Sequence, residues 1–344
     1  RPKYRQGAVR RLDRASGLAH ARAMAVYTDI SDEELSQLLA RYDLGQAQTF
    51  KGIAEGVENS NFLLETDRAR FILTIYERRV KREDLPFFLG LMRWLADHDY
   101  PCATPMPGRD GELIQEIRGK PAAIVSFLPG LSVRRPSAIH CREAGEGLAR
   151  LHLAASDFPM TRENSLGQPA WAPMFERLKP AAEGLKPGLA ATISADLEKL
   201  AQAWPQDLPR GVIHEDYFPD NVFFQGERFA ATIDFYFACV DMLAYDIAVA
   251  LNAWCFEADG SFNITNARAL VAGYERHRPL SAAERAALPI LAHGAAMRFF
   301  LTRLNDWGAT PAGALVRPKD PLEYERKLAV HRSAADLVLF GADS

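Results

Sequence analysis

The segment 211–224, G-V-I-H-E-D-Y-F-P-D-N-V-F-F, places a short polar loop between two apolar stretches. Within it, His214, Asp216 and Asn221 have the spacing H-x-D-x-x-x-x-N. A β-like run, F-A-A-T-I-D-F at 229–235, follows and carries another acid, Asp234. An H-x-D segment alone is also typical of a hairpin corner, where the Asp accepts hydrogen bonds from backbone amides. The second acidic segment, one hairpin later, favours a site that both segments build together.

The two segments have the spacing of the catalytic and metal-binding residues of protein kinases. ATP carries several negative charges, so phosphoryl transfer depends mostly on positioning and on charge neutralisation by Mg²⁺. Mg²⁺ prefers oxygen ligands, few of them from protein and the rest from phosphate and water. We therefore predict Asn221 and Asp234 as Mg²⁺ ligands. Asp216 and His214 are predicted as the catalytic residues, with Asp216 orienting the acceptor hydroxyl.

Length and charge limit the classes of protein to consider. The 344 residues suffice for one large domain or for two lobes. The formal net charge is −3, but residues 1–22 hold seven Arg or Lys and one acid, so the remainder carries about −9. A negative body argues against nucleic acid as the main partner. No apolar run reaches the roughly 18 residues that span a membrane. Four scattered cysteines without a C-x-x-C pair favour reduced thiols in a cytoplasmic protein.

Residues 1–23 differ in composition from the rest of the chain, because they are rich in Arg and poor in acids. A transit peptide has a similar composition. The texture changes at Met24, where the sequence M-A-V-Y-T-D-I-S begins. We therefore expect 1–23 to be a disordered upstream extension.

Residues 24–127 have the pattern of a small sheet with one or two helices. Ser31 and Glu34 form a capping box before an apolar stripe, which predicts a helix that ends at Gly45. Alternating apolar residues and turn signals predict antiparallel strands at 46–51, 61–66, 70–77, 112–117 and 122–127, with a helix at 83–98. The sequence L-P-G at 128–130 is predicted to be a hinge.

The turn between the first two strands, G-I-A-E-G-V-E-N-S at 52–60, contains two glycines. The backbone N–H groups of such a loop can approach phosphates, as in the Gly-rich loop of kinases, although G-x-G-x-x-G is not present. The alternative is an ordinary hairpin turn that needs positive φ. Both interpretations stay open, and the first predicts nucleotide contacts from Gly52, Gly56, Asn59 and Ser60.

Beyond residue 128 the pattern is helical. Apolar positions at helical spacing predict helices at 137–155, 172–183, 194–204, 244–255, 265–276, 281–304 and 321–338. His152 lies on the apolar face of the first of these, where we expect a core or capping role rather than catalysis. The predicted fold class is therefore α+β and bilobal, with a small antiparallel-sheet N-lobe at 24–127 and a larger, mostly helical C-lobe at 128–344.

With these motifs, the chain resembles the small-molecule kinases of the aminoglycoside-phosphotransferase type, which share the protein-kinase-like fold. More narrowly, it resembles the bacterial homoserine kinases of that type. The narrower resemblance rests on M-A-V-Y-T-D-I-S at 24–31, E-G-V-E-N-S-N at 55–61, I-V-S-F-L-P-G at 124–130 and I-D-F-Y-F-A-C at 233–239. It implies transfer of the γ-phosphoryl group of ATP to the side-chain hydroxyl of L-homoserine, giving O-phospho-L-homoserine in threonine biosynthesis. It also implies Mg²⁺ as cofactor, and a monomer or small homo-oligomer is expected.

The resemblance further implies roles for individual residues. The adenine ring would meet the backbone of Ser126, Phe127 and Leu128 at the hinge. Asp246, in the sequence Y-D-I-A-V at 245–249, would brace the catalytic loop. A helix N-cap is the alternative role for Asp246, and the two roles are compatible.

Two positions depart from the superfamily pattern. Thr74 stands where many members have a Lys or Arg that holds the α- and β-phosphates. The phosphate cation is thus unassigned, with Lys51, Arg78 and Arg79 as candidates that are equally typical of solvated surface charges. Glu215 stands where the superfamily usually has Gly, and we expect its carboxylate to point away from the phosphates.

An amino-acid acceptor is a zwitterion, which needs a cation for its carboxylate and an acid or an aromatic face for its ammonium. Arg298 and Arg303 lie in the apolar segment M-R-F-F-L-T-R-L at 297–304, where a charge needs a partner. We predict both arginines, together with Tyr236, as substrate-binding residues. The alternatives are an ion pair with a neighbour such as Asp306 for the arginines, and core packing for the tyrosine.

Two other functions are compatible with these motifs. One is the same chemistry on another small alcohol, such as choline, methylthioribose or an aminoglycoside; an aminoglycoside site would favour more acids in the C-lobe than this chain carries. The other is a nucleotide-binding pseudokinase without activity. The joint presence of Asp216, Asn221 and Asp234 argues against the pseudokinase.

Overall fold

The computed structural model describes residues 28–53, 59–77, 80–309 and 318–333. The extension predicted at 1–23 lies outside these residues. Gly56, Arg78 and Arg79 lie outside them as well, so their predicted contacts with the nucleotide stay untested.

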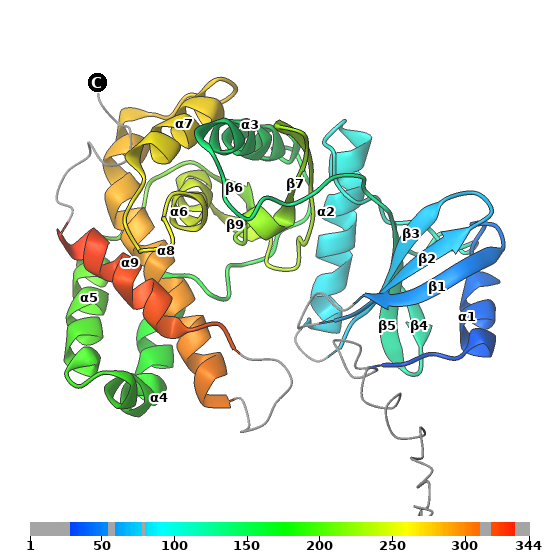
Figure 1. Cartoon of the computed structure of the whole chain (residues 1–344), viewed down its shortest axis with the longest axis horizontal. Coiled ribbons are helices and arrows are strands. Elements are labelled where there is room, and N and C mark those ends of the chain that lie inside the picture. Colours follow the sequence, from blue (N-terminus) through cyan, green and yellow to red (C-terminus); the bar gives the residue numbers. More distant parts are fainter. Residues whose placement is uncertain (1–27, 54–58, 78–79, 310–317, 334–344) are drawn as a thin grey trace, which may run out of the picture.

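A five-stranded antiparallel sheet forms the centre of the N-lobe (Figure 1). In spatial order its strands are β1 (Ala47–Ile53), β2 (Ser60–Thr66), β3 (Arg70–Ile75), β5 (Lys120–Ser126) and β4 (Gln115–Ile117). Every second residue of β2 is buried, as the alternating sequence predicts for a strand with one covered face. The lobe boundary predicted after residue 127 stays a prediction, and β5 ends at Ser126.

Two helices cover opposite faces of this sheet. Helix α1 (Asp32–Leu39) begins with the predicted capping box, and its Leu35 and Leu38 share an apolar cluster with one face of the sheet. The predicted end at Gly45 is wrong, because the chain leaves the helix after Leu39 and buries Tyr42 and Leu44 in the same cluster. The short helix η1 (Arg82–Asp84) leads into α2 (Leu85–Asp97), whose apolar residues pack with the opposite face.

The C-lobe is mostly helical, as predicted. Its helices are α3 (Ala138–Ala154), α4 (Gln168–Leu185), α5 (Leu189–Ala203), α6 (Leu243–Trp254), α7 (Ile264–Glu275), α8 (Ala282–Ala309) and α9 (Pro321–Ser333). Two short antiparallel pairs join β6 (Arg210–Ile213) to β9 (Cys239–Met242) and β7 (Val222–Gln225) to β8 (Arg228–Thr232), with the short helix η2 (Pro219–Asn221) before β7. Among the described helices, none combines the length and the apolar character needed to cross a membrane.

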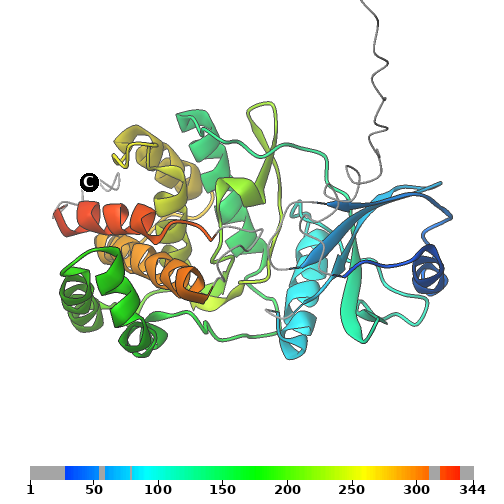
Figure 2. The same ribbon diagram turned by 60° about the horizontal axis from the view of Figure 1, so that its bottom comes forward.

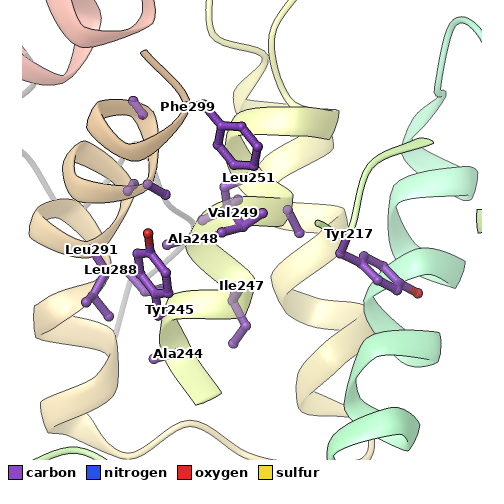
Figure 3. Close-up of a cluster of buried hydrophobic side chains, with 14 of the residues drawn as sticks. Tyr217, Ala244, Tyr245, Ile247, Ala248, Val249, Leu251, Leu288, Leu291 and Phe299 are labelled. Carbon is purple, nitrogen blue, oxygen red and sulfur yellow. The ribbon is translucent and has the colours of Figure 1, made fainter. Parts of the chain in front are cut away.

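Helix α6 lies at the centre of the C-lobe core. Its sequence, L-A-Y-D-I-A-V-A-L-N-A-W, is apolar around nearly its whole circumference, and all of its residues except Ala253 are buried. Figure 3 shows part of the cluster, where Tyr245 of α6 lies beside Leu288 and Leu291 of α8. A helix enclosed in this way holds the charged side chain of Asp246 in a fixed position.

The two lobes meet along α2, β8 and the residues that follow β8. Both views show α2 between the sheet and the C-lobe (Figures 1 and 2). The hydroxyl groups of Tyr76 and Tyr236 lie 3.0 Å apart across this boundary, and those of Tyr100 and Thr232 lie 2.7 Å apart. Further polar contacts between the lobes join Arg162 to Asp84 at 3.1 Å and the Nε1 of Trp94 to the backbone oxygen of Ala154 at 2.8 Å.

The contact between α3 and α7 gives a test of the packing. A Cβ atom added at Gly145 would lie 2.0 Å from the backbone oxygen of Leu270, an atom that the α7 helix holds in place. We expect Gly145→Ala to lower the free energy of unfolding by about 1–3 kcal/mol or more, because the backbones must separate. The matched control is Gly184→Ala in α4, where no atom lies within 4 Å of the added Cβ.

The control should raise stability by up to about 1 kcal/mol, since Ala favours a helix over Gly. Urea titrations of both variants measure the difference. Equal unfolding midpoints would contradict the close approach of α3 and α7.

Candidate active site

The loop after β6 is held by the carboxylate of Asp246, which α6 presents from the fully buried core. The oxygen Oδ2 accepts a hydrogen bond from the backbone N–H of His214 at 2.7 Å, and Oδ1 accepts one from Glu215 at 2.9 Å. The ring Nε2 of His152 lies 3.1 Å from Oδ2. Burial would raise the pKa of Asp246, but the His152 side chain and the His214 amide lower it below its usual value. Asp246 therefore braces the loop, and His152 lies in the core as expected.

His214 ties the catalytic loop to the strand that leads to Asp234. Its Nε2 lies 2.9 Å from the backbone oxygen of Ile233, and its Nδ1 accepts a hydrogen bond of 3.3 Å from the N–H of Asp216. The ring is fully buried, and this burial lowers its pKa. Because both ring nitrogens bind backbone, the geometry supports a positioning role for His214 rather than contact with a substrate.

Asn221 brings the two acidic segments together. Its Nδ2 donates hydrogen bonds to the backbone oxygen and the Oδ2 of Asp216, at 2.8 and 3.0 Å. The N–H of Ile233 donates to the backbone oxygen of Asn221 at 2.9 Å, which sets the following residue, Asp234, next to this loop. Asp234 is exposed and has a positive φ of 63°.

These contacts suit a Mg²⁺ site that a nucleotide completes. The amide nitrogen of Asn221 donates to Asp216, so Oδ1 is the side-chain atom of Asn221 that a metal could meet, and Asp234 is an exposed residue. Mg²⁺ commonly takes only one or two protein oxygens and fills the other positions with phosphate and water. The described residues contain no group of three or more His, Cys, Asp or Glu side chains that could hold a metal by themselves.

Arg298 of α8 lies beside the catalytic loop, between two carboxylates. Its Nη1 is 3.9 Å from Oδ1 of Asp216, and its Nε is 3.8 Å from Oε1 of Glu215. The guanidinium stacks on the ring of Phe299, with 4.0 Å from its carbon to the ring centroid. Only 2% of Arg298 is exposed. Arg298, predicted from the sequence as a substrate-binding residue, thus lies beside the predicted base, and its partners Asp216 and Glu215 were not foreseen.

Glu215 points into the C-lobe interior. Its Oε2 lies 3.5 Å from the Sγ of Cys239, its exposed fraction is 2%, and its φ is 63°, a conformation that favours glycine. Burial raises the pKa of Glu215 to about 7, against the opposing charge of Arg298. The positive φ gives a physical reason for glycine at this position in related loops.

The remaining predicted substrate residues have other partners. Arg303 donates to Glu323 at 2.6 Å and to the backbone oxygen of Asp320 at 3.2 Å, and it lies over the ring of Tyr324. It thus joins α8 to α9. Tyr236 is partly buried against α2, with an edge contact to Phe88 besides its hydroxyl contact with Tyr76.

At the phosphate end of the sheet, the predicted loop residues bind protein groups. Asn59 accepts from the N–H of Glu77 at 3.3 Å, and the Oγ of Ser60 donates to the Glu77 carboxylate at 2.7 Å. Glu77 and its ion pair with Lys120 could not be predicted from the sequence, because the two residues are adjacent only in the folded sheet. Gly52 lies in β1, inside the strand rather than at its turn.

Thr74 and Lys51 lie on the same face of the sheet. Thr74 of β3 donates a hydrogen bond of 2.8 Å to Asn61 of β2, the residue opposite it. Lys51 of β1 is exposed and pairs with Leu63, which has the same orientation as Asn61. Lys51 is therefore the described candidate for the missing phosphate cation.

Two of the three predicted hinge residues use their backbone amides within the protein. The N–H of Ser126 donates to Thr104 at 2.9 Å, and that of Phe127 donates to Arg70 at 3.2 Å. Both amides are engaged within the protein, whereas among the described residues the N–H of Leu128 has no backbone acceptor.

A profile of the phosphotransferase enzyme family matches residues 49–280. The chain belongs to this family. Among its relatives, a protein of Phenylobacterium zucineum (strain HLK1) named homoserine kinase is 75% identical over 319 residues, covering 93% of this chain and 99% of the relative. A homoserine kinase of Caulobacter vibrioides (strain NA1000 / CB15N) is 70% identical and covers 92% of this chain and 100% of the relative. The resemblance described from the motifs is thereby confirmed.

Solved structures agree with this family at the level of the fold. An amicoumacin kinase, solved in complex with AMP-PNP and Ca²⁺, superposes with a TM-score of 0.63 at 16% identity, covering 88% of this chain and 92% of that one. The predicted bilobal, protein-kinase-like α+β fold is confirmed.

The role of Asp246 in this phosphotransferase can be tested with Asp246→Asn. Asparagine keeps one acceptor oxygen, but its NH₂ group would face a backbone N–H in a site closed to water. We expect a loss of about 3–5 kcal/mol of unfolding free energy, since a buried charge network loses a member. Because the pKa of Asp246 is lowered on folding, its contribution is present above the ordinary Asp pKa and decreases as the pH falls below it.

The difference in unfolding free energy between wild type and Asp246→Asn should therefore become smaller in acid. The variant should also lose phosphotransferase activity, because the loop that carries Asp216 is no longer held in place. Urea unfolding at several pH values and rate measurements test both effects. Asp220→Asn, at an exposed position near the same loop, is the control and should change neither. Wild-type stability of Asp246→Asn at neutral pH would remove Asp246 from the bracing role.

Proposed function

We infer that this protein is a homoserine kinase, which transfers the γ-phosphoryl group of ATP to the side-chain hydroxyl of L-homoserine. The observation that carries this inference is the identity of 75% and 70% to proteins named homoserine kinase, over nearly the full length of each. The product is O-phospho-L-homoserine, an intermediate expected in threonine biosynthesis. The cytoplasmic location and the monomeric or small oligomeric state predicted from the sequence stay predictions.

Asp216 is proposed as the group that receives the hydroxyl proton. Its Oδ2 is held by the amide of Asn221, while Oδ1 faces the guanidinium of Arg298. This leaves a fixed carboxylate, which can orient the acceptor oxygen toward the phosphorus atom. Such positioning is most of what a protein supplies to phosphoryl transfer.

Asn221 and Asp234 are proposed to hold Mg²⁺ through Oδ1 and the carboxylate, respectively. The ion, when bound, neutralises charge on the phosphate oxygens. The hydrogen bond between Ile233 and Asn221 supports this proposal, because it keeps the two ligand-bearing segments in register. On the nucleotide side, the amide of Leu128 is proposed to meet the adenine, and Lys51 to meet the phosphates.

Arg298 is proposed to bind the carboxylate of the acceptor. Two of its N–H-bearing nitrogens, Nε and Nη2, have no hydrogen-bond partner among the described residues, although the side chain is buried. Arg303, by contrast, is satisfied by Glu323 and Asp320. Of the two arginines singled out in the sequence, Arg298 is therefore the one with free donors beside Asp216.

A panel of alcohols tests the proposed function. With Mg²⁺ and ATP, we expect L-homoserine to be phosphorylated far faster than choline, methylthioribose or an aminoglycoside. Asp216→Asn should bind ATP normally but lose roughly 10²–10⁴-fold in kcat, because the amide cannot accept the proton. Phosphorylated products are measured by ³¹P NMR. A preference for choline or for a sugar would refute the assignment to homoserine, and near-normal kcat in the variant would exclude Asp216 as the base.

A second prediction concerns the metal site. Asp234→Ala removes a carboxylate ligand, so addition of Mg²⁺ should no longer tighten ATP binding as it does in the wild type. Calorimetric ATP titrations with and without Mg²⁺ measure this dependence. Asp220→Ala is the control, because it removes an exposed carboxylate from a neighbouring position that is not assigned to the metal. An unchanged Mg²⁺ dependence in Asp234→Ala would exclude it as a ligand.

A further inference from the structure

Buried polar atoms without hydrogen-bond partners gather next to Asp216. Among the described residues, these atoms include Oε1 of Glu215 and both Nε and Nη2 of Arg298. Nε of Arg298 lies 3.8 Å from Oε1 of Glu215, and Nη1 of Arg298 lies 3.9 Å from Oδ1 of Asp216. The charged pair therefore adjoins the proposed catalytic carboxylate.

Leaving such atoms without partners is costly. A buried carboxylate or guanidinium that lacks hydrogen bonds loses several kcal/mol of hydration free energy, so native proteins almost always satisfy it. Glu215 and Arg298 could have satisfied each other, but their nearest atoms remain 3.8 Å apart. This separation is longer than a hydrogen bond. Glu215 therefore keeps an acceptor oxygen without a partner, and Arg298 keeps donor nitrogens without partners.

These donor and acceptor atoms without partners suit a ligand that carries both charges. Oε1 of Glu215 can accept hydrogen bonds from a cation, and Nη2 of Arg298 can donate to an anion. A guest that carries an ammonium and a carboxylate on the same carbon would satisfy both at once. Arg298 also lies 3.9 Å from Asp216, so a short chain can place its hydroxyl at Asp216 while its charged end reaches the pair.

We propose that Glu215 receives the α-ammonium group of the acceptor, opposite the carboxylate bound by Arg298, so that the pair selects an α-amino acid. This proposal rests on the proposed homoserine kinase function and specifies how its acceptor is chosen. Glu215 would then be a specificity-determining residue, because it contacts the substrate away from the reacting oxygen. The neighbouring thiol of Cys239, which lies 3.5 Å from Oε2, leaves Oε1 available for this contact.

Three acceptors separate the two charges. L-Homoserine has both groups, 4-hydroxybutanoate lacks the ammonium, and 3-aminopropan-1-ol lacks the carboxylate. In the wild type, each truncated acceptor should lose about tenfold or more in kcat/KM, as expected for one charge-assisted contact. Glu215→Gln should lower kcat/KM for homoserine by a similar factor, yet leave 4-hydroxybutanoate within about twofold of its wild-type value. Arg298→Met should instead abolish the preference over 3-aminopropan-1-ol.

The matched control is Glu284→Gln, which neutralises another buried carboxylate paired with an arginine, Arg278, outside this site. The control should leave the ratio of the homoserine and 4-hydroxybutanoate rates unchanged. An equal loss for both acceptors in Glu215→Gln would overturn the proposal, because it would make Glu215 a structural support for Arg298. If the wild type does not phosphorylate homoserine at all, the proposed function fails first, before the variants are compared.

A measurement on the wild type covers the case in which Glu215→Gln does not fold. A non-phosphorylatable analogue, L-2-aminobutyrate, and its deaminated counterpart, butanoate, are titrated as competitive inhibitors against homoserine. The inhibition constant of L-2-aminobutyrate should be at least about tenfold lower than that of butanoate, since only the amino acid carries an ammonium group for Glu215. Equal inhibition by the two would overturn the proposal without any variant.

Discussion

Two hydrogen bonds to one buried carboxylate hold the catalytic loop in place. The carboxylate of Asp246 accepts hydrogen bonds from the backbone N–H groups of His214 and Glu215, at 2.7 and 2.9 Å. Asp246 lies on a helix that is buried in the core. A charge in such a place is tolerated only with strong partners, and the loop backbone supplies them. The fold and the site are therefore coupled, because the same interaction neutralises a core charge and fixes the residue before Asp216.

Ile233 connects that loop to the second acidic segment by hydrogen bonds. Its backbone oxygen lies 2.9 Å from the His214 ring, and its N–H binds the backbone oxygen of Asn221. Asp216, the proposed base, and the proposed metal ligands thus share one hydrogen-bonded network. Arg298 enters this frame from α8, a helix packed against α6, so the acceptor side is fixed by the same core.

The sequence predicted those parts of the site that depend on local spacing. The spacing indicated that His214, Asp216, Asn221 and Asp234 belong to two neighbouring segments, because loop and hairpin lengths bring these together, and apolar periodicity predicted the bilobal fold. Partners that are distant in the chain could not be found in this way. Arg303 of α8 binds Glu323 of α9, and Glu215 meets Arg298 across more than eighty positions, through contacts that only tertiary packing creates. The helix end predicted at Gly45 failed for a similar reason, since the burial of Tyr42 and Leu44 outweighs local propensity.

The anchoring of the loop by Asp246 also determines how it should behave over time. Surface loops commonly exchange their amide hydrogens with solvent quickly, because brief local openings expose them. The amides of His214 and Glu215 can open only if a buried ion loses its partners, so they should exchange as slowly as those of the core helices. We therefore expect this segment, although its backbone forms a loop, to exchange its amides like part of the core. Motions that admit the nucleotide and release the product must then take place in the parts of the molecule around it.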